Sequence, residues 1–132
     1  CEDVAASGGY WLATAADEIF ANNASIIGSI GVISAGFGFP QALEKLGVER
    51  RIYTSGKSKS MLDPFRPEKE EDVQYLQRLQ SDIHQTFIDQ VKSRRGGRLD
   101  ASENELYSGQ FGPGSKRVNL VLWTVLAPCM IC

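Results

Sequence analysis

One short stretch of the sequence, Ala5-Ala6-Ser7-Gly8-Gly9, has the residue types and spacing of a nucleophilic site. A serine hydroxyl is a weak nucleophile until a nearby base removes its proton, and acyl transfer also needs N–H donors for the developing oxyanion. Glycines after the serine allow a sharp turn and leave backbone N–H groups unobstructed at a helix start. The stretch approaches the nucleophile pattern G-x-S-x-G, although Ala5 replaces the first glycine. The alternative is that Ser7 only caps the helix that follows.

Two kinds of side chain are candidates for activating Ser7. The single histidine, His84, falls within a long helical pattern, where a lone histidine is usually a surface or boundary residue, so a Ser-His-Asp triad is disfavoured. A lysine can serve as the base once desolvation or a neighbouring charge lowers its pKa. Lys57 and Lys59 are the candidates because both lie in a glycine-containing loop, and composition does not choose between them. The alternative for this pair is an ordinary solvated loop.

Composition argues against several other classes of protein. The chain has 132 residues, of which 42% are hydrophobic and 23% charged, as expected for one globular domain. Its 14 basic and 16 acidic residues are interleaved, so no basic face for nucleic acid is expected. The C-x-x-C spacing of Cys129 and Cys132 lacks a second ligand pair, so we expect neither a metal nor a redox site. No stretch reaches the roughly 18 to 20 apolar residues of a spanning helix, and no signal peptide is expected.

Helices and strands must alternate to position these residues. We expect a short buried helix over 10–16, strands over 18–21, 26–33 and 48–54, a helix over 40–46 that Gly47 ends, and a polar loop over 55–60. Apolar residues then recur every three or four positions, which predicts one amphipathic helix over 69–95. Gly96-Gly97 should end it with a positive φ, and a capping box over 102–105 predicts another short helix. This alternation is typical of the α/β class with crossover helices.

Three segments together resemble the signal peptide peptidase A and SohB family of serine peptidases. They are AASGGYWLATAADEIFANNASIIGSIGVI, LEKLGVERRIYTSGKSKS and PFRPEKEEDVQYLQRLQSDIHQTFIDQV, and they follow the family's order and spacing over residues 4–111. The resemblance implies a ClpP- and crotonase-like spiral of ββα units that is incomplete at the N-terminus and at the C-terminus. Residues 1–111 would then be a catalytic core fragment, and residues 112–132 a divergent tail that reads like a frame-shifted end; its other reading is an edge strand over 118–125.

The resemblance also implies a role for each residue of the site. Ser7 would be the nucleophile of a serine endopeptidase, Lys59 rather than Lys57 its general base, and Ser29 the residue that orients the lysine amine. Gly8 would supply the backbone donor to the oxyanion. Substrate contacts are expected from five residues, for which plain core packing is the alternative: Gly9, Tyr10, Ile30, Gly31 and Val32.

Partners and location are implied in the same way. The substrates would be cleaved signal peptides or unfolded segments, with no metal or cofactor, and the assembly a homo-oligomeric ring in which a neighbour can contribute Lys59. The resemblance implies a longer, membrane-anchored protein at the bacterial inner membrane or in the periplasm, with a cytoplasmic location as the alternative. Two other functions remain open. One is an inert oligomerisation or scaffold fragment, since the family's second oxyanion donor would precede Cys1; the other is a crotonase-like acyl-transfer enzyme.

Overall fold

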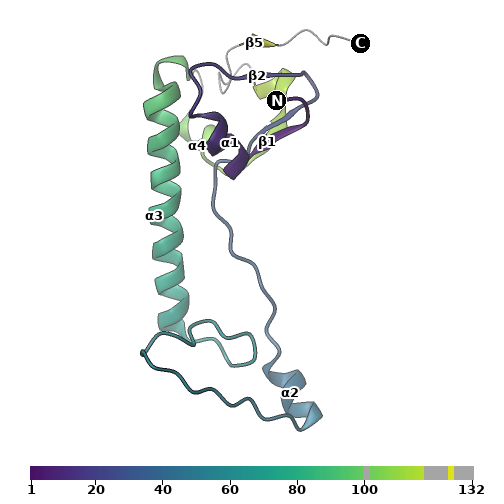
Figure 1. The fold of residues 1–132 in the computed structure, drawn as a ribbon, viewed down its shortest axis with the longest axis vertical. Coiled ribbons are helices and arrows are strands. Elements are labelled where there is room, and N and C mark those ends of the chain that lie inside the picture. The colour runs from purple at the N-terminus through teal and green to yellow at the C-terminus, as the bar shows by residue number, and fades with distance from the viewer. Residues whose placement is uncertain (100–101, 118–124, 127–132) are drawn as a thin grey trace. The chain divides into compact units, whose positions relative to one another are not determined.

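The chain has a mixed α/β fold, described by a computed structural model over residues 1–99, 102–117 and 125–126 (Figure 1). It divides into two compact units. The first comprises Cys1–Val32 with Asp82–Cys132, and the second comprises Ile33–Ser81. The mixed helix and strand content confirms the α/β expectation. Ser7 and Ser29 belong to the first unit, whereas Lys57 and Lys59 belong to the second.

A three-stranded sheet lies in the first unit. β1 (Val4–Ala6) pairs in parallel with β3 (Ile26–Gly28), and β3 pairs antiparallel with β4 (Phe111–Pro113). α1 (Gly8–Ala13) follows β1 after a single residue, and β2 (Phe20–Ala21) pairs in parallel with β5 (Val125–Leu126). Because parallel strands end at the same edge of a sheet, and because Ala6 lies opposite Gly28, the residues that follow β1 and β3 are neighbours.

The long helix α3 (Glu70–Arg95) confirms the amphipathic pattern. Acidic residues occupy its first turn and basic residues its last, which suits the helix dipole. Its C-terminal half buries Phe87 and Val91, and the Phe87 ring lies 5.1 Å from that of Trp11 in α1. The 3-10 helix η1 (Gly96–Arg98) and the short helices α4 (Glu103–Leu106) and α5 (Gly114–Arg117) follow. Among the described residues, the buried core contains Ala5, Tyr10, Ile19, Ala21, Ile27, Ile30, Phe87, Val91, Leu106 and Tyr107.

The second unit has one complete helix and the N-terminal turns of α3. α2 (Pro40–Leu46) begins and ends where the sequence predicts, because Pro40 fits the first turn and Gly47 adopts a left-handed φ of 65°. The remainder is irregular and is held by local contacts: the rings of Phe39 and Phe65 lie 5.6 Å apart, and the Arg50 guanidinium lies over the Phe65 ring. None of residues 33–81, all of which the structure describes, is fully buried.

Some predicted elements are wrong or differ in length. Residues 48–54 form no strand, because this stretch has no strand partner in the described part of the chain, and Tyr53 is 91% exposed. The predicted strand over 26–33 ends at Gly28, because Ser29 turns out of the sheet with a φ of 56°. The predicted strand over 18–21 is reduced to β2, and α1 occupies residues 8–13 instead of 10–16.

The chain ends α3 differently from the prediction. Neither Gly96 nor Gly97 adopts a positive φ, and both continue into η1 instead, so that expectation is wrong. The short helix predicted near the capping box is present as α4. β4 runs across the expected boundary between Phe111 and Gly112. Most of the possible edge strand over 118–125, and the C-x-x-C pair, lie outside the described residues.

Candidate active site

Ser7 occupies a sharp turn between β1 and α1 with a strained backbone. Its φ is 51° and its ψ is −123°, a conformation that residues with a Cβ rarely adopt. Such strain persists only where the surroundings enforce it. Here the Ser7 amide donates to the Gly28 carbonyl at 2.8 Å, and the Ser7 carbonyl accepts from the Trp11 amide at 2.9 Å. The backbone is therefore held from both the sheet and the helix.

The Ser7 hydroxyl is not used to cap α1. Ser7 stands at the N-cap position, yet its side chain makes no capping hydrogen bond, and the residue is exposed. A serine in this position ordinarily bonds to an amide of the first turn. The first amides of any helix, here those of Gly8 and Gly9, have no acceptor within the helix. The turn thus combines an uncommitted hydroxyl with adjacent backbone donors, which is the arrangement that acyl transfer needs.

Ser29 lies beside Ser7 at the same edge of the sheet. It directly follows Gly28, the register partner of Ala6, and its amide donates to the Gln110 carbonyl at 2.9 Å. Its φ of 56° is again left-handed, and the residue is half-buried. The structure therefore brings together the predicted nucleophile and the predicted orienting serine, both at strained positions after paired parallel strands.

The residues expected to contact substrate divide into two groups. Tyr10 and Ile30 are fully buried in the core, which favours the alternative of core packing for their side chains. Gly9 is exposed, Val32 is half-buried, and the backbone of Gly31 lies against that of Gly109. Only the latter three remain available to line a groove.

Tyr10 also makes a buried polar contact. Burial raises the pKa of its hydroxyl strongly, and the nearby Arg95 guanidinium, which shares a side-chain hydrogen bond with it, opposes that shift. The pKa of Arg95 is lowered by its own burial, against which Tyr10 acts. The pair joins α1 to the last turn of α3, so Tyr10 belongs to the structural support of Ser7.

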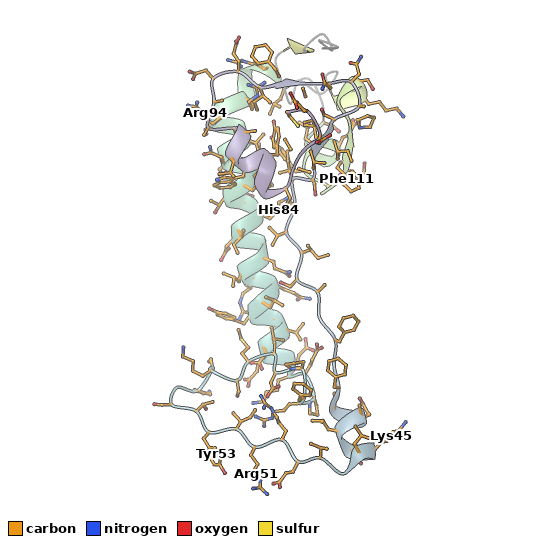
Figure 2. All side chains as sticks on the ribbon, turned by 45° about the vertical axis from the view of Figure 1, so that its right-hand side comes forward. Lys45, Arg51, Tyr53, His84, Arg94 and Phe111 are labelled. Carbon is orange, nitrogen blue, oxygen red and sulfur yellow. The ribbon has the colours of Figure 1, made fainter. Side chains whose placement is uncertain are left out.

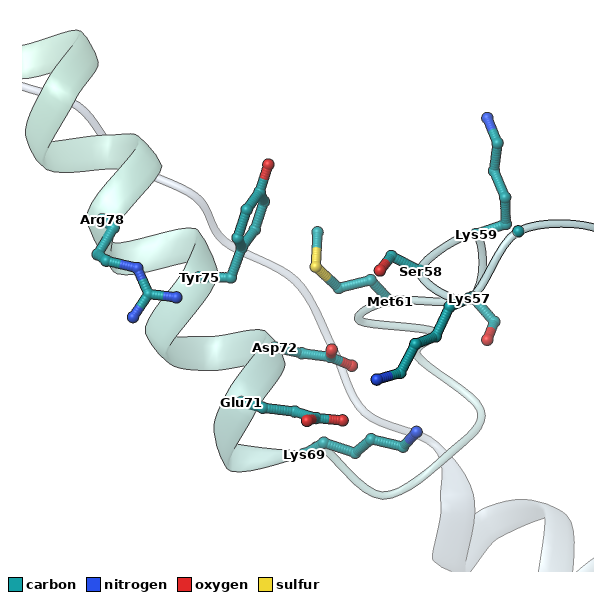
Figure 3. Close-up of a pocket in the computed structure, with 11 residues that line it drawn as sticks. Lys57, Ser58, Lys59, Met61, Lys69, Glu71, Asp72, Tyr75 and Arg78 are labelled. Carbon is teal, nitrogen blue, oxygen red and sulfur yellow. The ribbon is translucent and has the colours of Figure 1, made fainter.

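The two candidate lysines lie in a turn of the second unit. Residues of this turn and of the start of α3 line a cavity of about 660 Å³ (Figure 3). The amine of Lys57 points toward Glu71 and Asp72, whereas that of Lys59 points away from them. Both lysines are exposed. The Lys57 amine therefore lies near two carboxylates and the Lys69 amine, whereas the Lys59 amine points away from all three.

His84 also contacts the segment that follows Ser29, a role that the sequence analysis did not predict. Its Nε2 lies 3.1 Å from the Ile30 carbonyl oxygen, so Nε2 must carry a proton and donate it. The ring thus fixes the residue that follows Ser29 (Figure 2). The signal was present in the spacing, because His84 falls on the same helical face as Phe87 and Val91.

The sequence of the chain resembles those of known proteins. The family model described as Peptidase family S49 matches residues 1–118. A putative signal peptide peptidase SppA of Enterococcus faecium is 35% identical over 89% of this chain and 34% of its own length. The chloroplastic serine protease SPPA of Arabidopsis thaliana is 35% identical over 85% of this chain and 16% of its own length.

A third relative has a different name. A protein of Brucella abortus (strain 2308) named Na(+)/H(+) antiporter NhaA is 58% identical over 92% of this chain, a match that covers 16% of that relative. That name therefore describes a protein most of whose length lies outside the match. Among the described residues, no helix meets the length and hydropathy of a membrane span. The chain spans between about a sixth and a third of the relatives named here, and the match of the S49 model to nearly all of it shows that it belongs to peptidase family S49.

Proposed function

We propose that this chain carries the catalytic core of a serine endopeptidase in which Ser7 attacks the carbonyl carbon of a peptide bond. The observation that supports this most directly is that Ser7 is an exposed residue on a strained strand-to-helix turn and that its hydroxyl makes no capping hydrogen bond. A serine that served only the fold would cap α1 and would have no need of this backbone. Membership of a peptidase family supports the same reaction class.

The proposed reaction uses a lysine as the base. The neutral amine of Lys59 takes the Ser7 proton, Ser7 Oγ bonds to the peptide carbonyl carbon, and the Gly8 amide stabilises the oxyanion. The C–N bond then breaks, and the lysine ammonium returns its proton to the leaving amine. Water hydrolyses the acyl-enzyme in the second half of the reaction. Ser29 would orient the lysine amine through its hydroxyl.

The base must be desolvated in order to be neutral near pH 7, and Lys59 is exposed in the single chain. We infer that a second copy of the chain covers this region in a homo-oligomeric ring. The second unit, which has no fully buried residue, exposes 86% of Ile33, 82% of Phe37 and 75% of Leu46. Exposed apolar surface of this kind commonly marks an interface. Within such a ring, the neighbouring copy can contribute Lys59 to Ser7.

The proposed substrates are extended peptides, such as cleaved signal peptides or unfolded segments. Gly9, Gly31 and Val32 would contact them, with the buried side chains of Tyr10 and Ile30 as support. The ClpP-like spiral of ββα units is part of the same proposal, supported by the β1–Ser7–α1 turn and the parallel β3 beside it. A membrane-associated or periplasmic location is a prediction for the protein that carries the chain.

An active-site probe tests the proposal. A fluorophosphonate should label the chain, or the full-length gene product if that is longer, at Ser7, and Ser7→Ala should abolish the labelling. Lys59→Ala should slow labelling by several orders of magnitude, as loss of a catalytic base does. Lys57→Ala is the matched control and should label normally. Absence of labelling in the wild-type assembly would favour the inert scaffold, and thioester turnover without peptide cleavage would favour the acyl-transfer enzyme.

A mixing experiment tests the shared site. If a neighbour supplies the base, co-assembly of equal amounts of Ser7→Ala and Lys59→Ala chains should restore about one quarter of wild-type activity, since half of the chains retain Ser7 and half of their neighbours retain Lys59. A site contained within one copy would stay inactive in every mixture.

A further inference from the structure

The C-terminal end of α1 is held by side chains from the last turns of α3. Arg94 on α3 spans two consecutive carbonyls: its Nε donates to Thr14 O at 3.0 Å, and its Nη2 donates to Ala15 O at 2.9 Å (Figure 2). Gln90 Nε2, one turn earlier, donates to Thr14 Oγ1 at 3.3 Å. The last carbonyls of α1 are satisfied locally, by the amides of Thr14, Ala15 and Ala16. The two carbonyls that follow, those of Thr14 and Ala15, are adjacent acceptors that suit a planar guanidinium. Arg94 thus ties the turn after α1 to α3.

The two hydrogen bonds to carbonyl oxygens account for most of the contact between Arg94 and the turn after α1, and the nearby ion pair adds little. Arg94 Nη2 also reaches Asp17 Oδ1 at 3.3 Å, but the Asp17 side chain is 98% exposed. Exposed pairs of this kind contribute little to stability. The two contributions can therefore be separated by substitution. A change at Asp17 removes the ion pair alone, whereas a change at Arg94 removes the ion pair together with the two hydrogen bonds to carbonyl oxygens.

α1 is too short to keep its own orientation. It has six residues, and isolated helices need about 12–15 residues to be even marginally stable in water. At about 1.5 Å per residue, its two ends are only about 9 Å apart. The N-terminal end follows Ser7, whose amide donates a hydrogen bond to Gly28 O in the sheet, and the C-terminal end runs into Thr14, whose carbonyl accepts from Arg94. The strained turn at Ser7 is therefore fixed from two sides.

We propose that Arg94 is a positioning residue for the Ser7 nucleophile, acting through the backbone of α1. The role it would play in catalysis rests on the proposed function, while the mechanical link to α1 does not. Without the guanidinium, α1 would keep the contacts of Tyr10 and Trp11 with α3 but lose those of its C-terminal turn, and Ser7 would spend less time aligned for attack. Small misalignments of reacting groups lower the rate of the chemical step more than the binding of substrate.

Kinetics provide the first test in the full chain. Arg94→Gln should lower kcat for a fluorogenic peptide about tenfold while KM changes less than about twofold. Arg94→Lys, which keeps the charge and one donor, should recover part of that loss. Asp17→Asn is the matched control for the ion pair and should behave as wild type. Val91→Ala, a buried α3 position outside the site, controls for stability and should retain kcat at temperatures where it stays folded. Wild-type kcat in Arg94→Gln, or an equal loss in Val91→Ala, would overturn the proposal.

Hydrogen exchange provides a second test that needs no activity. In a Ser7→Ala background, Arg94→Gln should accelerate exchange of the α1 amides, that of Trp11 included, and of the Thr14 amide that follows, by about tenfold or more, while the β1 and β3 amides change little. Unchanged exchange in α1 would refute the mechanical link. If the wild-type chain labels with no serine probe, the proposed function fails, yet the exchange measurement still decides whether Arg94 holds α1.

Discussion

Replacing Gly31 by alanine would test how closely two glycine backbones must approach beside the site. A Cβ at Gly31 would lie 3.0 Å from the Gly109 Cα, where ordinary contacts are 3.4–4 Å, so the two segments must separate by a few tenths of an ångström. The obstacle is backbone, and Gly109 is itself in a left-handed turn with a φ of 80°, so no side-chain rotation relieves the clash. Overpacking of this kind costs about 1–3 kcal/mol.

The effect should be large against a total stability of about 5–15 kcal/mol. For a domain of this size, it corresponds to a fall in Tm of roughly 5–10 °C, measurable by thermal or urea denaturation followed by circular dichroism. Gly36→Ala is the matched control, because no heavy atom lies within 4 Å of its added Cβ, and it should stay within about 0.5 kcal/mol of wild type. If Gly31→Ala proves as stable as Gly36→Ala, the close approach of the two backbones does not matter and the reasoning is wrong.

Two further substitutions separate structural from chemical roles. His84→Gln should leave the pH dependence of probe labelling at Ser7 unchanged in shape, because His84 Nε2 is committed as a donor to Ile30 O and cannot accept the Ser7 proton; loss of the acidic limb would instead identify His84 as the base. Tyr10→Phe should cost about 1–3 kcal/mol at pH 7 by removing the partner of the buried Arg95. Because burial raises the folded-state pKa of Tyr10, wild-type stability should fall as pH rises above about 10, by up to about 1.4 kcal/mol per pH unit, and urea unfolding of Tyr10→Phe should lack this component.

Local signals in the sequence predicted the helices of this chain well. Pro40 and Gly47 fix the two ends of α2 because each acts through its own backbone geometry. The apolar repeat of α3 predicts a helix whose observed first residue is one later than expected. The alternation over 48–54 was misleading, since a strand exists only where a partner strand supplies hydrogen bonds, and none of the described residues does so here.

The geometry of the site depends on contacts that no local pattern encodes. The adjacency of Ser7 and Ser29 follows from the register of β1 and β3, which pairs residues 22 positions apart in the sequence. His84 and Arg94 donate hydrogen bonds to backbone carbonyls of segments far away in the sequence. Because every residue has a backbone carbonyl, the sequence does not indicate which ones they bind. The resemblance to a family supplied the roles, and the pairing of strands supplied the arrangement.

Ser7 and Ser29, neighbours at one edge of the sheet, both have a positive φ, which bears on the residues that the backbone prefers at these positions. Glycine adopts such backbones without steric penalty, so exchanging either serine for glycine would relieve strain. Backbone strain alone therefore favours glycine at both positions, although glycine loses more conformational entropy on folding. The backbone itself calls for no side chain at either position, so the proposed chemistry of the two hydroxyls is what would account for serine there.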